Sequence, residues 1–150
     1  MTNAANDSAR SNATTWLVWL LRMDGVLLLC AIPFIFIPFS VMAEIHTWLG
    51  LGELHETPLM NYLTRSLSMI YALHGAVVLY VSCDVMKNWN LIRLLAMLTV
   101  ALGAVLAWVD FSAGIPWWWL LSEGPPIVAF GAWILAIQRH IQHLDQRPLS

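Results

Sequence analysis

The sequence predicts an all-α membrane protein, a four-transmembrane-helix bundle with a short interfacial helix in the first outer loop. Three observations carry this prediction. Of the 150 residues, 59% are hydrophobic and 11% are charged, whereas a soluble domain has about 25% charged residues. Four apolar runs each reach the ~20 residues that a helix needs to span a bilayer. Five of the seven cationic residues gather on one predicted side of the membrane.

The chain divides into a membrane domain and two polar ends. Residues 1–13 are small and polar, so we expect a disordered cytoplasmic tail. The membrane domain covers residues 14–141, and residues 142–150 form a second cytoplasmic tail. The predicted spans lie at about residues 16–39, 58–83, 91–111 and 116–137.

The first span is interrupted by prolines. Pro33 and Pro38 remove backbone donors, so we expect a kink or an unwound stretch toward the outer end. Val41-Met42-Ala43 resembles a signal-peptide cleavage site, and cleavage there would leave three spans. The apolar run begins at Trp16, however, and is longer than the signal-peptide core of about 7–15 residues. We therefore interpret the first run as a retained span.

The first outer loop has the pattern of an amphipathic helix. Glu44 and Thr47 fall on the side opposite the apolar face. That apolar face consists of Val41, Met42, Ile45, Trp48 and Leu49. A helix of this kind lies in the membrane interface, and Gly50-Leu51-Gly52 would end it.

Small residues predict that the second and third spans pack closely, because small side chains let two helix backbones approach each other. In the second span the small and polar face consists of Asn61, Thr64, Arg65, Ser68, Ala72 and Gly75. In the third span the stripe consists of Ala96, Thr99, Gly103, Ala107 and Asp110. We expect these two faces to meet.

The fourth span begins with an aromatic triplet and contains a second proline site. Trp117-Trp118-Trp119 is typical of an anchor at the outer membrane interface. Gly124-Pro125-Pro126 either kinks the span or interrupts it, in which case the helix restarts at Pro125.

Charge asymmetry predicts the orientation. Residues 41–57 and 112–115 contain no Lys or Arg. The opposite side carries Arg10, Lys87, Arg93, Arg139 and Arg147. The positive-inside rule therefore places both termini and the loop at residues 84–90 in the cytoplasm, as in a multi-pass protein.

Five ionisable residues inside the spans are candidates for a site, because charges in hydrocarbon need partners. At 1.5 Å per residue, Arg65 lies ~10 Å and Glu123 ~9 Å from the outer side. Asp110 lies at the outer end of the third span, so we expect Arg65 to pair with Asp110, Glu123 or both. Asp24 and His74 lie in the inner half and form a second candidate pair. The outer cluster either binds a ligand or fixes helix register.

Several function classes lack the residues that they need. His74 is the one histidine deep in a span, so a bis-histidine diheme site is not expected. Cys30 and Cys83 form no Cys-x-x-Cys motif. We predict no cofactor and no metal site. The net charge of −2 gives no footprint for nucleic acid. Membrane lipids are the expected partners, and the sequence leaves open self-association or association with another protein.

Three local motifs carry a resemblance. They are Trp48-Leu49-Gly50-Leu51-Gly52-Glu53-Leu54, then Tyr62-Leu63-Thr64-Arg65-Ser66-Leu67-Ser68 through His74-Gly75, and Ile115-Pro116-Trp117-Trp118-Trp119 with Glu123-Gly124-Pro125. Together they resemble uncharacterised small four-span bacterial membrane proteins, which are similar in layout to the DoxX-like group. The resemblance implies a bundle in the bacterial inner membrane. It implies no catalytic residues.

Three functions remain open from the sequence. The first is a non-enzymatic scaffold, accessory subunit or lipid-binding module. The second is a binder or carrier of a small amphipathic ligand, a quinone or a lipid, in a pocket lined by Arg65, Asp110 and Glu123. The third is an intramembrane isomerase that uses Asp24 or Glu123 with His74 as acid and base.

Overall fold

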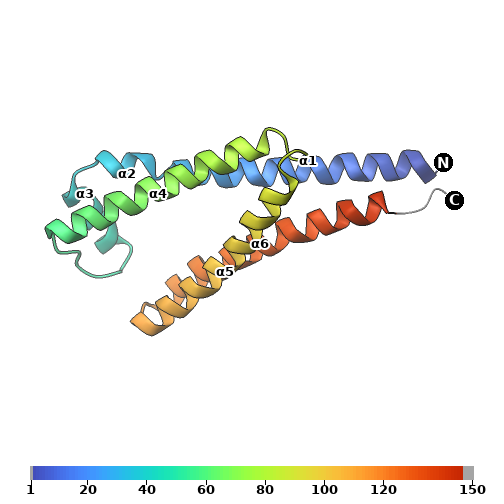
Figure 1. Cartoon of the computed structure of the whole chain (residues 1–150). Coiled ribbons are helices and arrows are strands. Elements are labelled where there is room, and N and C mark those ends of the chain that lie inside the picture. Colours follow the sequence, from blue (N-terminus) through green and yellow to red (C-terminus); the bar gives the residue numbers. More distant parts are fainter. Residues whose placement is uncertain (1, 147–150) are drawn as a thin grey trace. The chain divides into compact units, whose positions relative to one another are not determined.

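The computed structural model describes residues 2–146, with side chains from residue 6 onward, and its regular structure is entirely helical (Figure 1). Its helices are α1 (Thr2–Leu29), α2 (Ile32–Phe36), α3 (Phe39–Trp48), α4 (Pro58–Ser82), α5 (Trp89–Ala113) and α6 (Trp117–Asp145). The described residues contain no strand, which confirms the all-α prediction. The chain forms two compact units, Arg22–Tyr80 and the combination of Met1–Leu21 with Val81–Ser150.

Three segments of the described chain are long and apolar enough to cross a membrane. They are Asn6–Phe36, Trp89–Ala113 and Trp117–Asp145. Within the most apolar stretch of each segment, only 11–17% of the residues are buried. Large apolar side chains such as Trp16, Trp108 and Trp117 are more than 60% exposed. Because soluble monomers rarely expose such continuous apolar surface, lipid must cover it. The protein is therefore a membrane protein.

Helix α4 fills the second predicted span but is less apolar than the other three segments. It has 25 residues, enough to cross a bilayer. Its polar residues lower its hydropathy, and it is not among the candidate segments. The polar residues that lower the hydropathy in the first part of α4 are Asn61, Thr64, Arg65, Ser66 and Ser68. The fourth crossing and the interfacial position of α3 stay predictions.

The N-terminal end differs from the expected disordered tail. Helix α1 already begins at Thr2 and includes most of residues 1–13. The hydroxyl of Thr14 donates to the carbonyl of Arg10 at 3.0 Å. Arg10 Nε also lies 3.0 Å from Asp145 Oδ1, the last residue of α6. The polar residues near the N-terminus thus form hydrogen bonds within α1 and an ion pair with α6. The composition of a short polar segment does not reveal such contacts.

In the unit Arg22–Tyr80, two prolines end helices where the sequence predicted a break. Helix α1 ends at Leu29, and Pro33 lies in the first turn of α2, where its missing N–H costs nothing. Ile37 ends α2 in an extended conformation, and Pro38 precedes α3. The prediction of an interrupted first span is confirmed.

Helices α1 and α4 approach each other through glycines. A Cβ added to Gly75 would lie 2.7 Å from the carbonyl oxygen of Gly25. A Cβ added to Gly25 would lie 2.6 Å from Cγ of Leu79. Real Cβ atoms do not come so close, so both positions require glycine. The small face of α4 therefore packs on α1.

In the other unit, α5 and α6 lie side by side and antiparallel (Figure 1). A Cβ added to Gly103 would lie 2.8 Å from the Gly124 carbonyl oxygen, and one added to Gly131 would lie 2.8 Å from the Ala96 carbonyl oxygen. The stripe predicted on the third span is therefore an interface, but its observed partner is α6. The prediction that the second span packs on this stripe was wrong, because α6 carries its own glycines on the face that meets α5.

Helix α6 is continuous through Gly124-Pro125-Pro126, so the alternative restart at Pro125 is wrong. Both prolines are exposed, as are Leu121 and Ser122, whose carbonyls would accept from them in an ideal helix. The lost backbone bonds therefore lie on the outer face of α6. Gly124, on the other face, is buried against α5.

We expect Gly103→Ala to destabilise the α5–α6 pair. The added methyl group meets the backbone of α6, and such overpacking costs about 1–3 kcal/mol. The melting temperature in detergent should fall clearly, whereas Ala104→Leu, an exposed position on the same helix, should leave it nearly unchanged. Equal melting temperatures for both variants would contradict this packing.

Candidate functional site

Arg65 on α4 is held by three hydrogen bonds within its own unit. Its Nε donates to Asn61 Oδ1 at 2.6 Å, one helical turn away. Its Nη1 donates to the carbonyl of Ile35 at 2.8 Å, and Nη2 donates to the carbonyl of Ile37 at 3.4 Å. The guanidinium is half-buried. Arg65 therefore bridges α4 to the end of α2.

The two carbonyls are those that the helix break leaves without helical donors. The last carbonyls of any helix lack partners within it. Ile37 is extended, so the helical hydrogen-bond pattern stops there, and Pro38, which follows it, has no N–H to donate. An unpaired carbonyl in lipid costs several kcal/mol. Arg65 donates from three separate nitrogens in one planar group, whereas a lysine has a single donor nitrogen.

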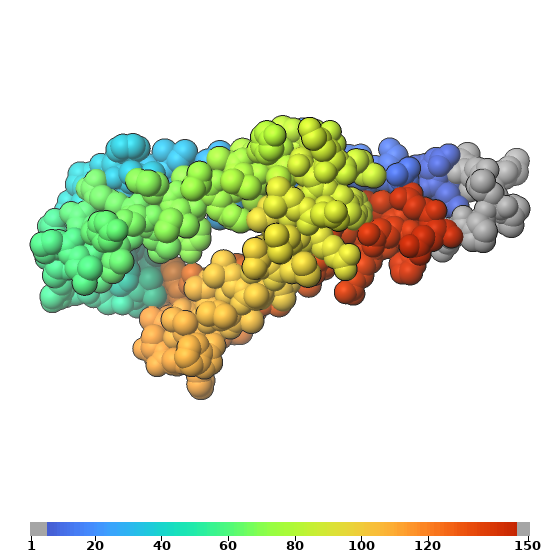
Figure 2. Space-filling view, in the orientation of Figure 1, coloured from blue at the N-terminus to red at the C-terminus, as the bar shows by residue number. Residues whose placement is uncertain are grey.

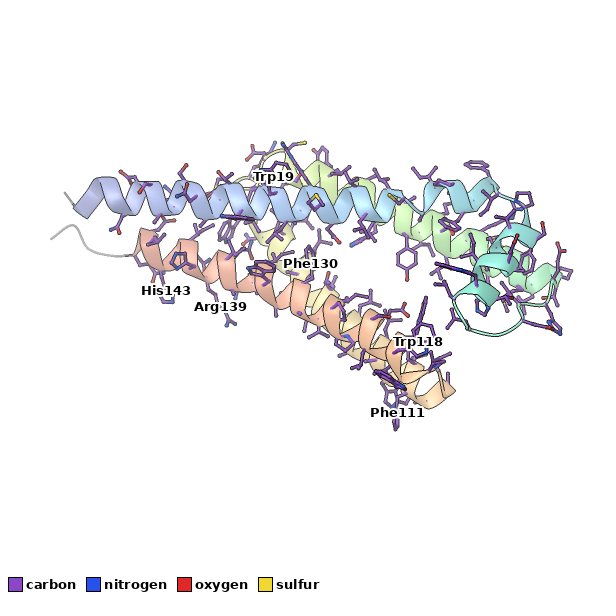
Figure 3. All side chains as sticks on the ribbon, turned by 180° about the vertical axis from the view of Figure 1, so that it is seen from behind. Trp19, Phe111, Trp118, Phe130, Arg139 and His143 are labelled. Atoms are coloured by element: carbon purple, nitrogen blue, oxygen red, sulfur yellow. The ribbon has the colours of Figure 1, made fainter. Side chains whose placement is uncertain are left out.

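The two candidate carboxylates, Asp110 and Glu123, belong to the other unit. The predicted pairing of Arg65 with them therefore stays a prediction. Gly124 packs on Ala107, so the antiparallel register puts Asp110 and Glu123 toward the same end of the α5–α6 pair. Figure 3 shows Phe111 and Trp118 at this end.

Glu123 and Asp110 differ in the hydrogen bonds that their carboxylates accept. Glu123 Oε2 accepts a hydrogen bond of 2.6 Å from the indole Nε1 of Trp119, one turn earlier in α6. Asp110 is only 8% exposed, and its buried Oδ2 has no hydrogen-bond partner in the described part of the chain. Glu123 thus orients one tryptophan of the aromatic triplet, and Asp110 retains one unused acceptor.

Asp24 on α1 and His74 on α4 interact electrostatically, and both are half-buried. The close approach of Gly25 and Gly75, the residues next to them in sequence, brings the two side chains together. An acid next to an imidazole is able to exchange a proton, and the assignment of Asp24 and His74 as a secondary site stays a prediction.

An open groove of about 460 Å³ lies between the N-terminal part of α1 and α6, both in the same unit. Its walls are almost entirely apolar. The residues that line it are Ala13, Trp16, Trp133, Ala136, Ile137 and His140. The groove has the size and character of a site for an amphipathic molecule.

Gln138 is a buried polar residue that the sequence interpretation missed. It is 3% exposed, and its Nε2 donates to the carbonyl of Trp89 at the start of α5 at 3.1 Å. Figure 2 shows the first turns of α5, in yellow, against the last part of α6, in red. The predicted fourth span ended at residue 137, one residue too early to include it. The spacing of Gly131, Ile134, Gln138 and Ile141 on one face is the signal that reveals it.

No group of three or more His, Cys, Asp or Glu side chains suited to a metal ion occurs among the residues that the structure describes. Comparison with protein-family models, with curated proteins and with solved structures gives no match for this chain. Function must therefore be argued from the residues themselves.

We expect Arg65→Lys to lower the melting temperature in detergent, although it keeps the positive charge. The single ammonium nitrogen of lysine does not reproduce the three donor positions that reach Asn61, Ile35 and Ile37, and loss of a hydrogen bond to a charged group costs about 1.5–3 kcal/mol. Arg65→Met should be destabilised further. Arg22→Lys, an exposed cation on α1, is the matched control. A melting temperature of Arg65→Lys equal to that of the control would show that the charge alone matters.

Proposed function

We propose that this chain is a four-span protein of the bacterial inner membrane with both termini in the cytoplasm. In this proposal it acts as a non-enzymatic scaffold, an accessory subunit or a lipid-binding module. The observation that carries it is the set of hydrogen bonds from Arg65 to the Ile35 and Ile37 carbonyls. The most conspicuous intramembrane charge thus stabilises a helix break. The layout similar to DoxX-like proteins agrees with this proposal.

Helix directions support the fourth crossing. The ion pair of Arg10 with Asp145 joins the N-terminal part of α1 to the C-terminal end of α6, as expected for antiparallel helices, and α5 also runs antiparallel to α6. If α1 and α5 cross the membrane in the same direction, the chain returns across the membrane between them. Only α4, with 25 residues, is long enough to do this in the described chain. The close approach of Gly25 and Gly75 fits an antiparallel return.

Cysteine labelling tests this topology. We expect the native Cys83 to react with a membrane-impermeant maleimide only from the cytoplasmic side, in a Cys30→Ala background. Glu53→Cys, in a chain without both native cysteines, should react only from the outer side. If α4 did not cross, both positions would react from the same side, and the four-span proposal would be wrong.

A thermodynamic cycle tests whether the intramembrane charges serve structure. Arg65→Ala and Glu123→Gln should each lower the melting temperature, since each removes an observed hydrogen bond. Their double variant reports whether the two sites interact, because additive effects indicate independent sites and non-additive effects a direct pair. Stability of both single variants at the wild-type level would remove the basis of the structural role and favour a ligand role.

One observation favours a second candidate function, the binding or transport of a small amphipathic ligand. It is the groove of about 460 Å³ with two tryptophans and a single imidazole, that of His140, among its lining residues. A quinone or lipid has the matching apolar body and polar end. Mass spectrometry of extracts from the purified protein distinguishes the two functions, because a carrier should copurify with one such molecule and lose it in Trp133→Ala.

A further inference from the structure

A second, smaller cavity lies between α5 and α6 near the N-terminal end of α5. Its volume is about 120 Å³. The residues that line it are Arg93, Met97, Leu135, Gln138, Arg139 and Gln142. All of them belong to one unit, so the cavity is a property of the helix pair. A cavity of this size is smaller than the ~300–1,000 Å³ of sites for whole drug-sized ligands. It suits a single small polar group.

The lining is cationic. Arg93 from α5 and Arg139 from α6 both line the cavity, and no carboxylate does. Both side chains are exposed, so their guanidinium groups are accessible from outside the helix pair. Figure 3 shows Arg139 and His143 on the C-terminal part of α6. The acid that follows on α6, Asp145, is paired with Arg10. Two arginines without a carboxylate form a site for an anion, because guanidinium groups bind phosphate in a fork geometry.

Gln138 also lines the cavity. Its Nε2 donates to the carbonyl of Trp89, which fixes the direction of the amide. Its Oε1 has no hydrogen-bond partner in the described part of the chain, but this oxygen has almost no accessible surface. A ligand in the cavity therefore contacts the arginines and not Oε1, and the group that it must offer is an anion.

The position of the cavity relative to the membrane identifies the source of the ligand. Arg93 is four residues into α5, ~6 Å from its first residue along the helix axis. In the proposed topology this end of α5 lies at the cytoplasmic interface. Met97 and Leu135 form the wall nearer to the membrane centre. A molecule with acyl chains along the exposed apolar surface of α5 would present its headgroup to the arginines, and basic cavities of this kind between helices bind lipid headgroups.

We propose that this cavity binds the phosphate of an anionic phospholipid, such as phosphatidylglycerol. The phosphodiester lies between the guanidinium groups of Arg93 and Arg139. Binding involves no covalent step. This inference deepens the proposed function as a lipid-binding module, and its leaflet assignment rests on the proposed topology.

Native mass spectrometry of the full chain in detergent tests the proposal, since it counts bound lipids without reference to a leaflet. We expect phosphatidylglycerol to bind the wild type more tightly than phosphatidylcholine at equal concentration. The double variant Arg93→Gln with Arg139→Gln should lose about tenfold or more of this affinity, because each basic residue near a lipid surface contributes about fivefold. Arg22→Gln, a cation of the other unit, is the matched control and should bind as the wild type does.

A competition experiment separates the alternatives. Millimolar inorganic phosphate should not displace the lipid. Displacement by phosphate would overturn the lipid assignment in favour of a soluble anion. Equal binding of both lipids to wild type and double variant would overturn the site itself.

The outcome of the lipid-binding measurement can be distinguished from the outcome of the cysteine-labelling experiment. The melting temperature of each variant is measured first, and Arg93→Lys with Arg139→Lys replaces the double variant if the glutamines prevent folding. Lysines keep the charge but lose the fork, so we expect an affinity between those of the wild type and the glutamine variant. If cysteine labelling reversed the topology while these affinities held, the leaflet would change and the site would stand.

Discussion

The central constraint on this protein is that backbone polar groups in lipid must find partners within the chain. Pro33 lies in the first turn of α2, and the extended Ile37 with Pro38 ends this helix after five residues, which leaves carbonyls without helical donors at the end of α2. Arg65 answers this by donating to the carbonyls of Ile35 and Ile37. The charge that looks costly in isolation therefore satisfies a deficit that the prolines create. The helix break and Arg65 therefore belong to one structural feature. Without Arg65, the carbonyls at the end of α2 would lose their hydrogen-bond donors.

Close backbone approach at glycines supplies the remaining specificity. Gly25 faces Gly75 in one unit, and Gly103 faces Gly124 in the other. Lipid gives no hydrophobic drive for helices to associate, so tight van der Waals packing must do so. The same contacts set register. They bring Asp24 to His74, and they bring Asp110 and Glu123 to one end of their helix pair, without any direct bond between those side chains being required.

The sequence predicts local features of this protein better than the partners of its helices. Proline chemistry correctly predicted the break near Pro38, and small residues correctly marked the stripe through Gly103. Which helix meets that stripe depends on three-dimensional register, and α4 and α6 both offer small faces. The continuity of α6 was also open, since Pro125 and Pro126 are tolerated only because they lie on an exposed face. Gln138 escaped notice because hydropathy places the end of the span just before it.

The length of α1 and α6 has a consequence for the membrane that hosts them. With 28 and 29 residues, each helix is ~42 Å long, whereas a hydrocarbon core is about 30 Å thick. Their surplus turns meet at the Arg10–Asp145 ion pair, which is 44% exposed and contributes little to stability. A thicker or thinner bilayer can thus be matched by sliding or tilting at this end, where polar turns enter or leave the headgroup layer. At the other end of α6, the Trp117–Trp119 triplet is typical of an interfacial anchor, so we expect that end to keep its depth while the polar end adjusts.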